Sequence, residues 1–187
     1  MARPNQTRDL VIRHAKQADA KALAAMMREL HAYKGDLAGR FTLKCARQLL
    51  GVKSFITALI AELDKQPVAF AFLLPAFESC RAACGLYVSD FHITEHARQR
   101  GVGRAMMSAC AAEAKRQGKT FLWWASKAWD VDEHHFYRTV SATEEPVMAH
   151  VLTLENFQKL AREGERHVPQ IKRAKRPQIV GRNKPTK

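Results

Sequence analysis

The sequence has no long apolar run and no recognisable export signal. Nowhere in its 187 residues is there an uninterrupted apolar stretch of about 18 residues, the length that a membrane-spanning helix needs. Residues 1–16 also lack the apolar core of about 7 to 15 residues and the small-residue cleavage site of a secretory signal. We therefore expect no membrane span and a cytoplasmic protein.

Cysteine is scarce and is not arranged for metal binding or for disulfides. The chain has four cysteines, and the C-x-x-C spacing that is typical of zinc sites does not occur. Cys80 and Cys84 form only an isolated C-x-x-x-C. We expect free thiols in a reducing compartment and no metal centre.

Acidic residues are fewer than basic ones, and the imbalance is concentrated near the C-terminus. The chain has 31 Lys and Arg against 18 Asp and Glu, a net charge of +13. Residues 171–187 contribute seven basic residues and no acidic one, so the other 170 residues carry only +6. A mildly basic body of this kind does not by itself indicate a nucleic-acid-binding protein.

The C-terminal charges admit three interpretations. They form a solvated extension, an electrostatic contact to RNA or DNA, or an arm that docks on another subunit. No aromatic residue interleaves with them, so sequence-specific nucleic-acid recognition is not indicated. We divide the chain into a leader (1–9), one packed domain (10–163) and a basic tail that we expect to be flexible (164–187).

Hydrophobic periodicity predicts both helices and strands in the first half of the chain. Apolar residues recur at helical spacing after Asp19, which suits an N-cap, and Thr42 stands where it would cap a second helix. Asp64 to Pro67 is a turn signal between two β-type runs. The predicted elements are a strand at 10–13, helices at 20–33 and 43–50, and strands at 55–63, 68–74 and 84–93.

The second half is predicted to add further helices and strands. An alanine-rich helix at 104–117 ends at Gly118. The run at 120–125 is short and strongly apolar, which favours a central strand buried on both faces. A helix at 132–138, a strand at 147–152 and a helix at 154–162 follow. This order predicts a mixed α/β fold around one sheet.

The segment with the clearest chemistry joins a strand to a helix through the pattern Arg98-x-x-Gly101-x-Gly103. Glycine lets the backbone turn sharply and approach a ligand closely, and the start of the following helix presents free amides to an anion. A plain β-to-α turn explains the spacing equally well. A Rossmann fingerprint would need a small residue at Met106, and no Walker lysine follows, so neither motif is indicated.

Three segments resemble the GNAT N-acetyltransferase superfamily. Arg98 to Ala105 is similar to its acyl-CoA-binding motif, Arg/Gln-x-x-Gly-x-Gly/Ala. Gly85 to Ile93 resembles the preceding strand, particularly in the diamine and polyamine (spermidine/spermine-like) branch, and Trp129 to Tyr137 resembles a later element that ends in Phe-Tyr. The resemblance covers about 10–161. It implies a GNAT-type fold, with a twisted, mostly antiparallel central sheet flanked by helices and a V-shaped opening for acyl-CoA.

The resemblance implies an acyltransferase that moves the acetyl group of acetyl-CoA directly to a primary amine through a tetrahedral intermediate. It places the pantetheine arm beside Phe91, His92 and Ile93, with a bulge near Phe91 or His92 that frees an amide for the thioester oxygen. It places the pyrophosphate on the glycine loop, through Arg98, Gln99, Arg100, Gly101, Val102, Gly103, Arg104 and Ala105.

The same resemblance suggests catalytic residues. Tyr137 matches the tyrosine that protonates the departing CoA thiolate, and an ordinary pair of core aromatics, Phe136 and Tyr137, is the alternative. Asp130 stands where the family has an Asn that contacts CoA. His92 is a candidate base or water-binding residue, with a buried core histidine as the alternative.

The acceptor site is matched only in part. Asp90 and Glu78 coincide with acidic positions of the polyamine branch, and Asp90 is also a catalytic candidate. Ser89 replaces the Glu that this branch uses in proton removal. The candidate substrate-binding residues are Tyr33, Asp36, Glu78, Ser89 and Asp90.

The charge balance bears on the choice of acceptor. A basic body attracts spermidine or spermine weakly, so we expect a small amine, a diamine or an amino acid. Two alternatives stay open: acetylation of a protein or peptide, and a CoA-binding regulatory module whose basic tail contacts nucleic acid. Many relatives are homodimers, and the sequence leaves the oligomeric state open.

Overall fold

The computed structural model describes residues 10–35 and 40–167, and the chain divides into two compact units, Met1–Thr143 and Glu144–Lys187. Asp36, the leader and the basic cluster after residue 170 lie outside the described residues. The stretch 10–163, which we expected to be one domain, crosses the boundary between the two units.

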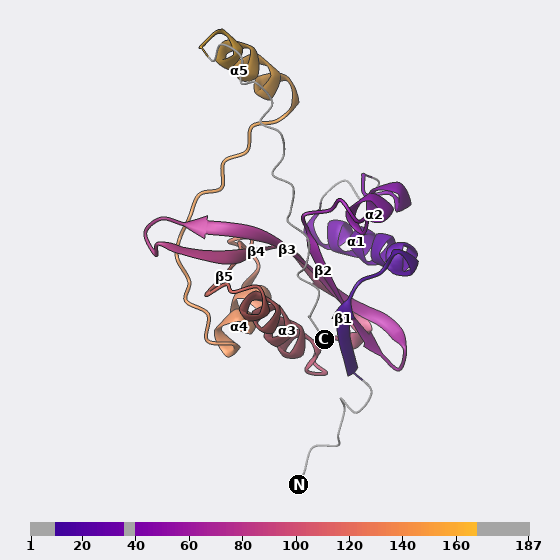
Figure 1. The fold of residues 1–187 in the computed structure, drawn as a ribbon. Coiled ribbons are helices and arrows are strands. Elements are labelled where there is room, and N and C mark those ends of the chain that lie inside the picture. The colour runs from indigo at the N-terminus through magenta and orange to yellow at the C-terminus, as the bar shows by residue number, and fades with distance from the viewer. Residues whose placement is uncertain (1–9, 36–39, 168–187) are drawn as a thin grey trace, which may run out of the picture. The chain divides into compact units, whose positions relative to one another are not determined.

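A five-stranded sheet forms the centre of the first unit (Figure 1). Its strands lie side by side in sequence order, and every pair is antiparallel except the last. The last pair is parallel because the helix α3 (Val102–Arg116) carries the chain back between its two strands. This arrangement confirms the predicted fold class. The strands are β1 (Leu10–His14), β2 (Thr57–Leu63), β3 (Gln66–Glu78), β4 (Ala83–Ile93) and β5 (Leu122–Trp123).

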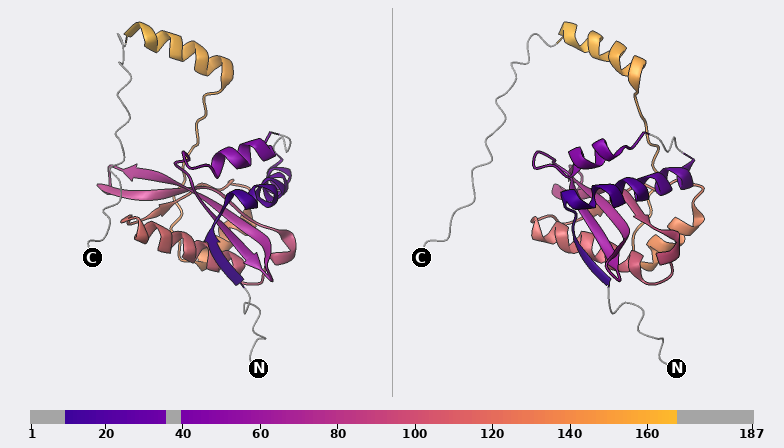
Figure 2. Two further views of the ribbon diagram at one scale, coloured as in Figure 1. Left: turned by 45° about the vertical axis from the view of Figure 1, so that its right-hand side comes forward. Right: turned by 90° about the vertical axis from the view of Figure 1, so that its right-hand side faces the viewer.

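Helices cover both faces of the sheet (Figure 2). One face carries α1 (Ala20–Lys34) and α2 (Leu43–Leu49), the other carries α3, and α4 (Val131–Thr139) follows β5. Thr42 caps α2 as predicted, and a glycine ends α1. Gly35 ends α1 with φ 71°, and Thr42 Oγ1 accepts the amide of Cys45 at 3.3 Å to cap α2.

The sheet buries apolar side chains on both faces. Phe70 and Phe72 are almost completely buried in the layer beneath α1 and α2, and Leu73, Leu86 and Met106 are buried in the layer that contains α3. Each of these side chains contributes about 1.5–3 kcal/mol by leaving water. The central strands are therefore held rigidly where the candidate site begins.

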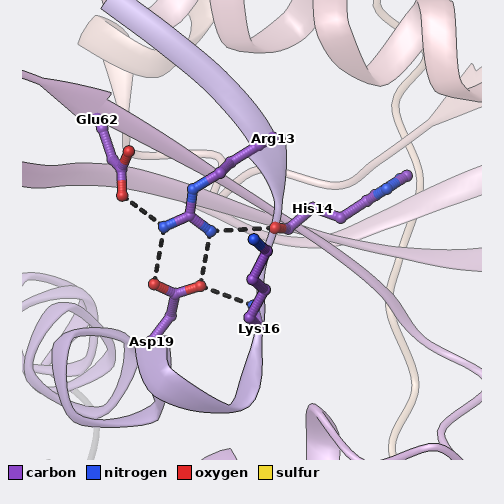
Figure 3. Close-up of polar contacts among 5 residues, drawn as sticks. All are labelled: Arg13, His14, Lys16, Asp19 and Glu62. Carbon is purple, nitrogen blue, oxygen red and sulfur yellow. Dashed lines mark hydrogen bonds and ion pairs between the residues drawn. The ribbon is translucent and has the colours of Figure 1, made fainter. Parts of the chain in front are cut away.

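An ion cluster ties the start of α1 to the sheet (Figure 3). The Arg13 guanidinium donates to both carboxylate oxygens of Asp19, at 2.7 and 2.9 Å, and also pairs with Glu62 on β2. Asp19 accepts the amide of Lys16 at 2.6 Å, so its carboxylate closes the turn before α1 and does not cap the helix as predicted. The adjacent guanidinium lowers the pKa of Asp19.

The strand predicted at 120–125 is shorter and less central than expected. β5 contains only Leu122 and Trp123, and it stands last in the strand order. Trp123 is 46% exposed, and its ring centroid lies 4.9 Å from that of Tyr87. The apolar run reflects aromatic packing on an outer strand, so the expectation of burial on both faces is wrong.

The second unit contains one helix, α5 (Leu154–His167), among its described residues. It begins where predicted and extends beyond residue 162. Residues 144–153 have no regular secondary structure, and Val147 and Val151 are 61% and 85% exposed. The strand predicted at 147–152 is therefore wrong. A run of apolar residues makes a strand only when another strand pairs with it, and no strand in the described part of the chain pairs with this run.

Candidate active site

β4 leaves its parallel neighbour part-way along its length, and this divergence defines the candidate site. Leu86 and Tyr87 pair with β5, and the amide of Leu86 donates to the carbonyl of Phe121 at 3.0 Å. Beyond Tyr87, β4 pairs only with β3 among the described strands. The backbone of Val88–Ile93 thus presents an edge without a described strand partner on this side, which suits an extended ligand. We call this stretch the open β4 edge.

One irregularity interrupts β4. The register with β3 shifts between Val88 and Asp90, so Ser89 forms a β-bulge, and its hydroxyl donates to Asp90 Oδ2 at 2.9 Å. The bulge expected near Phe91 or His92 therefore lies earlier in the strand. Those two residues have regular cross-strand partners in β3, which leaves no extra residue at their positions.

After the bulge, alternate side chains of β4 face opposite sides of the sheet. Asp90 pairs with Phe72 and His92 pairs with Phe70, and both phenylalanines belong to the core layer beneath α1. Cross-strand partners share a face, so Asp90 and His92 face α1. The structure therefore brings together two of the predicted catalytic residues.

Phe91 and Ile93, which alternate with these two residues along β4, face α3 and α4. The Phe91 ring stacks on Phe136 of α4, with centroids 6.2 Å apart. Gly103 fits into the same region: a Cβ on it would lie 2.9 Å from Ile93 Cδ1 and 3.0 Å from the Phe136 ring. The second glycine of the loop is therefore required by the close packing of α3 against β4 and α4.

The glycine loop enters α3 through left-handed backbone. Gln99 has φ 58°, and Gly101, directly before the helix, has φ 79°. Helix geometry leaves the amides of residues 102–104 without intrahelical acceptors, which suits a phosphate. The Val102 side chain itself is buried in the core. The amide of Ala105 donates to the carbonyl of Gly101 at 3.1 Å, so it is already engaged, contrary to the expectation that it binds the pyrophosphate.

Arginines surround this helix start. Arg98 Nε donates to the carbonyl of Ile93 at 3.2 Å, and its guanidinium lies over the Tyr33 ring, 5.2 Å from the centroid. Arg104 donates to a carbonyl at the end of α4 at 2.7 Å. A guanidinium has five N–H groups, so both side chains retain donors for a phosphate. With Arg100 they give the start of α3 a positive charge.

Tyr33 and Asp130 connect α1 to α4. The Tyr33 hydroxyl donates to Asp130 Oδ2 at 3.0 Å, and Asp130 Oδ1 accepts the amide of Glu133 at 3.0 Å and caps α4. Asp130 is 3% exposed. Both carboxylate oxygens therefore already accept hydrogen bonds inside the protein. Asp130 was expected to contact CoA, and in the structure it caps the N-terminus of α4.

Tyr137 lies on α4 with its ring among aromatic neighbours. Its centroid is 5.0 Å from that of Trp124 and 5.2 Å from that of Phe136, and the residue is buried. Burial, followed by the charges of Glu133 and Asp130, raises the pKa of Tyr137. The hydroxyl therefore stays protonated at neutral pH, which is the form a proton donor needs.

His92 has a partner that sequence reasoning missed. Its Nε2 lies 3.2 Å from Oε2 of Glu29 on α1. The His92 side chain is 5% exposed and that of Glu29 is 53% exposed, so the pair reaches from the core layer to the surface. Burial lowers the pKa of His92, and Glu29 opposes part of this effect. The two residues are 63 positions apart, and no local pattern links them.

Glu78 does not gather with Asp90. Glu78 pairs with Ala83 at the far end of the β3–β4 hairpin, roughly 20 Å from Asp90 at about 3.3 Å per residue. Its carboxylate pairs instead with Arg81 at 2.6 Å. The expectation that Glu78 and Asp90 share one substrate site is therefore wrong within a single chain. Asp36 lies outside the described residues.

An open strand edge that leads to a helix N-terminus is the geometry of an acyltransferase that binds an extended, phosphate-bearing acyl donor. Comparison with known families agrees. Residues 12–140 match the model of the Acetyltransferase (GNAT) family, and the chain belongs to this family. It is an acyltransferase, and acetyl-CoA is the co-substrate of the family.

Two curated proteins support N-acetyltransferase activity. The chain is 33% identical over 114 residues to the uncharacterized N-acetyltransferase YhfO of Bacillus subtilis (strain 168), a match over 59% of this chain and 74% of that protein. It is 29% identical over 79 residues to the L-ornithine N5-acetyltransferase NATA1 of Arabidopsis thaliana, a match over 42% of this chain and 35% of that protein.

Solved structures share the fold. An integron cassette protein from V. cholerae matches with a TM-score of 0.70 at 17% identity, over 82% of this chain and 98% of that one. An aminoglycoside acetyltransferase from a soil metagenomic sample matches with a TM-score of 0.66 at 17% identity, over 79% and 97%. At these identities the likeness concerns the fold alone.

The described residues form neither a metal centre nor a membrane span, and they enclose one pocket beside the candidate site. Within 10–35 and 40–167, no three His, Cys, Asp or Glu residues are placed to hold a metal ion, and no helix is both long and apolar enough to cross a membrane. A pocket of about 560 Å³ beside α3 and β5 is lined by Met107, Phe121 and Trp124 among others, and by no residue of the open β4 edge. Arg104 also lines this pocket, so the pocket adjoins the arginines at the start of α3 and is separate only from the open β4 edge.

Proposed function

We propose that the chain transfers the acetyl group of acetyl-CoA to the primary amine of a small amine, a diamine or an amino acid. The observation that carries this proposal is the open β4 edge from Val88 to Ile93, which leads directly into the glycine loop. An extended amide-containing arm bonds to such an edge as an added strand would. The phosphate end of the same ligand then falls at the start of α3.

The residues at the start of α3 fit a pyrophosphate. The amides of residues 102–104 lack intrahelical acceptors, and the helix dipole adds a partial positive charge there. Arg98, Arg100 and Arg104 supply cations, and Arg98 is held in place by its bond to the Ile93 carbonyl. The donor's reactive end then lies along β4, between the bulge at Ser89 and His92.

The chemistry needs a polarised thioester and controlled proton transfer. A neutral amine nitrogen attacks the thioester carbonyl carbon, a C–N bond forms, and the C–S bond breaks. Tyr137 is the donor that we assign to the departing thiolate, because its hydroxyl is protonated at neutral pH and α4 lies beside β4. The bulge at Ser89 is the position in β4 at which an amide is free to stabilise the oxyanion.

The acceptor reaches the site from the side of the sheet that α1 covers. Asp90 faces this side and offers a carboxylate for a cationic acceptor, and the Ser89 hydroxyl lies 2.9 Å from that carboxylate. Ornithine, the substrate in the name of the plant relative, is a small amino acid with two amino groups, which supports an acceptor of this size. Since Glu78 lies at the far end of the hairpin, fewer carboxylates are available than a polyamine would engage.

A thiol assay tests this function. The full-length protein is mixed with acetyl-CoA and a panel of acceptors: monoamines, diamines, polyamines, amino acids, and peptides with a free α-amine or lysine. We expect CoA release with the small amines, and mass spectrometry to find one added acetyl group on the acceptor. Release with peptides alone would replace the proposal by protein acetylation, and CoA binding without turnover would favour a regulatory module.

A further inference from the structure

The Glu29–His92 contact joins the surface of α1 to the middle of β4. Nε2 of His92 and Oε2 of Glu29 are 3.2 Å apart. An ionised carboxylate only accepts hydrogen bonds, so the imidazole donates through Nε2–H in its neutral form. That tautomer leaves the lone pair on Nδ1, which is the atom that can then accept a proton.

The position of His92 suits such a role. It lies on the open β4 edge, between two residues whose side chains face α3 and α4, and it shares the α1 side of the sheet with Asp90. The proposed function places the thioester along this edge and the acceptor on this side. The imidazole therefore stands between the surface and the atoms that react.

We propose that His92, oriented by Glu29, is the base that takes the proton from the attacking amine nitrogen. This inference rests on the proposed acetyl transfer. His92 is the catalytic residue of the pair because it meets the substrate nitrogen, and Glu29 is a positioning residue that acts through His92.

The proton count balances. As the C–N bond forms, the amine nitrogen becomes positively charged and loses one proton to Nδ1 of His92. The C–S bond breaks, and the thiolate receives one proton from Tyr137. Glu29 stabilises the imidazolium through Nε2–H. After the product leaves, Nδ1 of His92 loses its proton to solvent, which restores the Nε2–H tautomer, and the tyrosinate regains a proton from solvent. The net products are the acetylated amine and CoA thiol.

The charges around the imidazole determine when it is ready to act. Burial favours the neutral ring and lowers the pKa of His92, Glu29 on α1 opposes this, and Lys34 on α1 and Arg98 in the glycine loop add to the lowering. Asp90 lies on the same face of β4. At neutral pH the ring is therefore uncharged and able to accept a proton.

Steady-state kinetics of three variants tests the pair. His92→Gln keeps a polar group beside Glu29 but removes the base, so we expect kcat to fall about 100-fold with little change in KM for acetyl-CoA. Glu29→Gln should lower kcat about 10-fold, and Glu29→Asp should recover part of the loss. Asp64→Asn, in the exposed β2–β3 turn, removes one carboxylate elsewhere and should leave kcat unchanged.

A second readout does not depend on turnover. Nitrogen-15 NMR of histidine-labelled protein without ligand should show His92 protonated at Nε2, and Glu29→Gln should weaken this tautomer preference and lower the pKa of His92. An Nδ1–H tautomer in the wild type, or wild-type kcat in His92→Gln, overturns the inference alone. If the folded wild type releases no CoA with any acceptor of the panel, the acetyl transfer itself is overturned, and the inference with it.

Discussion

The Tyr33 hydroxyl donates a 3.0 Å hydrogen bond to the carboxylate of Asp130, a residue 97 positions further along the chain. Asp130 is buried, and its second oxygen caps α4, while the Arg98 guanidinium lies over the Tyr33 ring. The end of α1, the start of α4 and the glycine loop therefore share one set of contacts. A substitution in any of these three segments should change both the stability of the fold and the shape of the acetyl-CoA site.

Removing the Tyr33 hydroxyl tests this connection. Tyr33→Phe keeps the ring beneath Arg98 but removes one hydrogen bond from a buried carboxylate, so we expect the free energy of unfolding to fall by about 1–2 kcal/mol. Urea denaturation measures it. The control is Tyr87→Phe, which keeps the ring contact with Trp123 and should change stability by less than about 0.5 kcal/mol. Equal effects would mean that the Tyr33–Asp130 bond contributes nothing specific.

Substitutions of Asp130 separate a structural role from a CoA contact. Asp130→Asn retains an oxygen for the amide of Glu133 and a polar group for Tyr33, so stability should fall by less than about 1 kcal/mol, whereas Asp130→Ala should lose about 1–3 kcal/mol. Calorimetric titration of Asp130→Asn with CoA should give a dissociation constant within about threefold of the wild-type value. A much tighter CoA complex in Asp130→Asn would show that the carboxylate repels the ligand directly.

Local signals were sufficient for much of the first unit. The ends of α1 and α2 depend on Gly35 and Thr42, and the β2–β3 turn on residues 64 and 65, each of which acts within a few positions of itself. Periodicity does not encode which elements meet. The segment at 147–152 has the apolar composition of a strand but no strand partner among the described residues, and the 120–125 run lies at the end of the strand order.

In the candidate site, too, local sequence signals predicted some features, and others depend on tertiary contacts. Arg98, Gly101 and Gly103 were recognised because the motif is contiguous. The bulge at Ser89 depends on the register between two strands, and the partner of His92 comes from a helix more than sixty positions away, so neither has a local signature. Sequence patterns therefore locate the segments that form the site, and tertiary pairing decides which side chains in them meet.

The Arg13–Asp19 pair should make stability depend on acid pH. The pKa of Asp19 is lowered in the folded protein, so its contribution is complete above the unfolded value of about 3.9 and is lost as the pH falls through the folded value. Asp19→Asn should therefore destabilise the protein by about 1–3 kcal/mol at pH 6 and by progressively less below pH 4. Urea titrations at several pH values measure this. Glu78→Gln, which breaks the more exposed pair with Arg81, should have a smaller effect at every pH.

Gly103 offers a test of packing at the donor site. In Gly103→Ala the new Cβ would lie closer to Ile93 and to the Phe136 ring than ordinary van der Waals contact. The free energy of unfolding should therefore fall by about 1–2 kcal/mol, despite the better helix propensity of alanine. Adding Ile93→Val removes the Cδ1 that lies 2.9 Å away, so the double variant should be more stable than the sum of the single effects. Strict additivity would place the strain elsewhere.

Tyr137→Phe tests the proton donor. The substitution leaves the aromatic contacts with Trp124 and Phe136 in place and removes only the hydroxyl, so kcat should fall about 10²- to 10⁴-fold while the dissociation constant of acetyl-CoA changes little. Because the pKa of Tyr137 is raised above its usual value of about 10, this group should cause no loss of kcat between about pH 7 and 9 in the wild type. An unchanged kcat in Tyr137→Phe would remove the residue from the mechanism and leave it as a packing residue of α4. A loss of acetyl-CoA affinity with kcat unchanged would instead assign the hydroxyl to donor binding, since a pure acid acts only after the donor is bound.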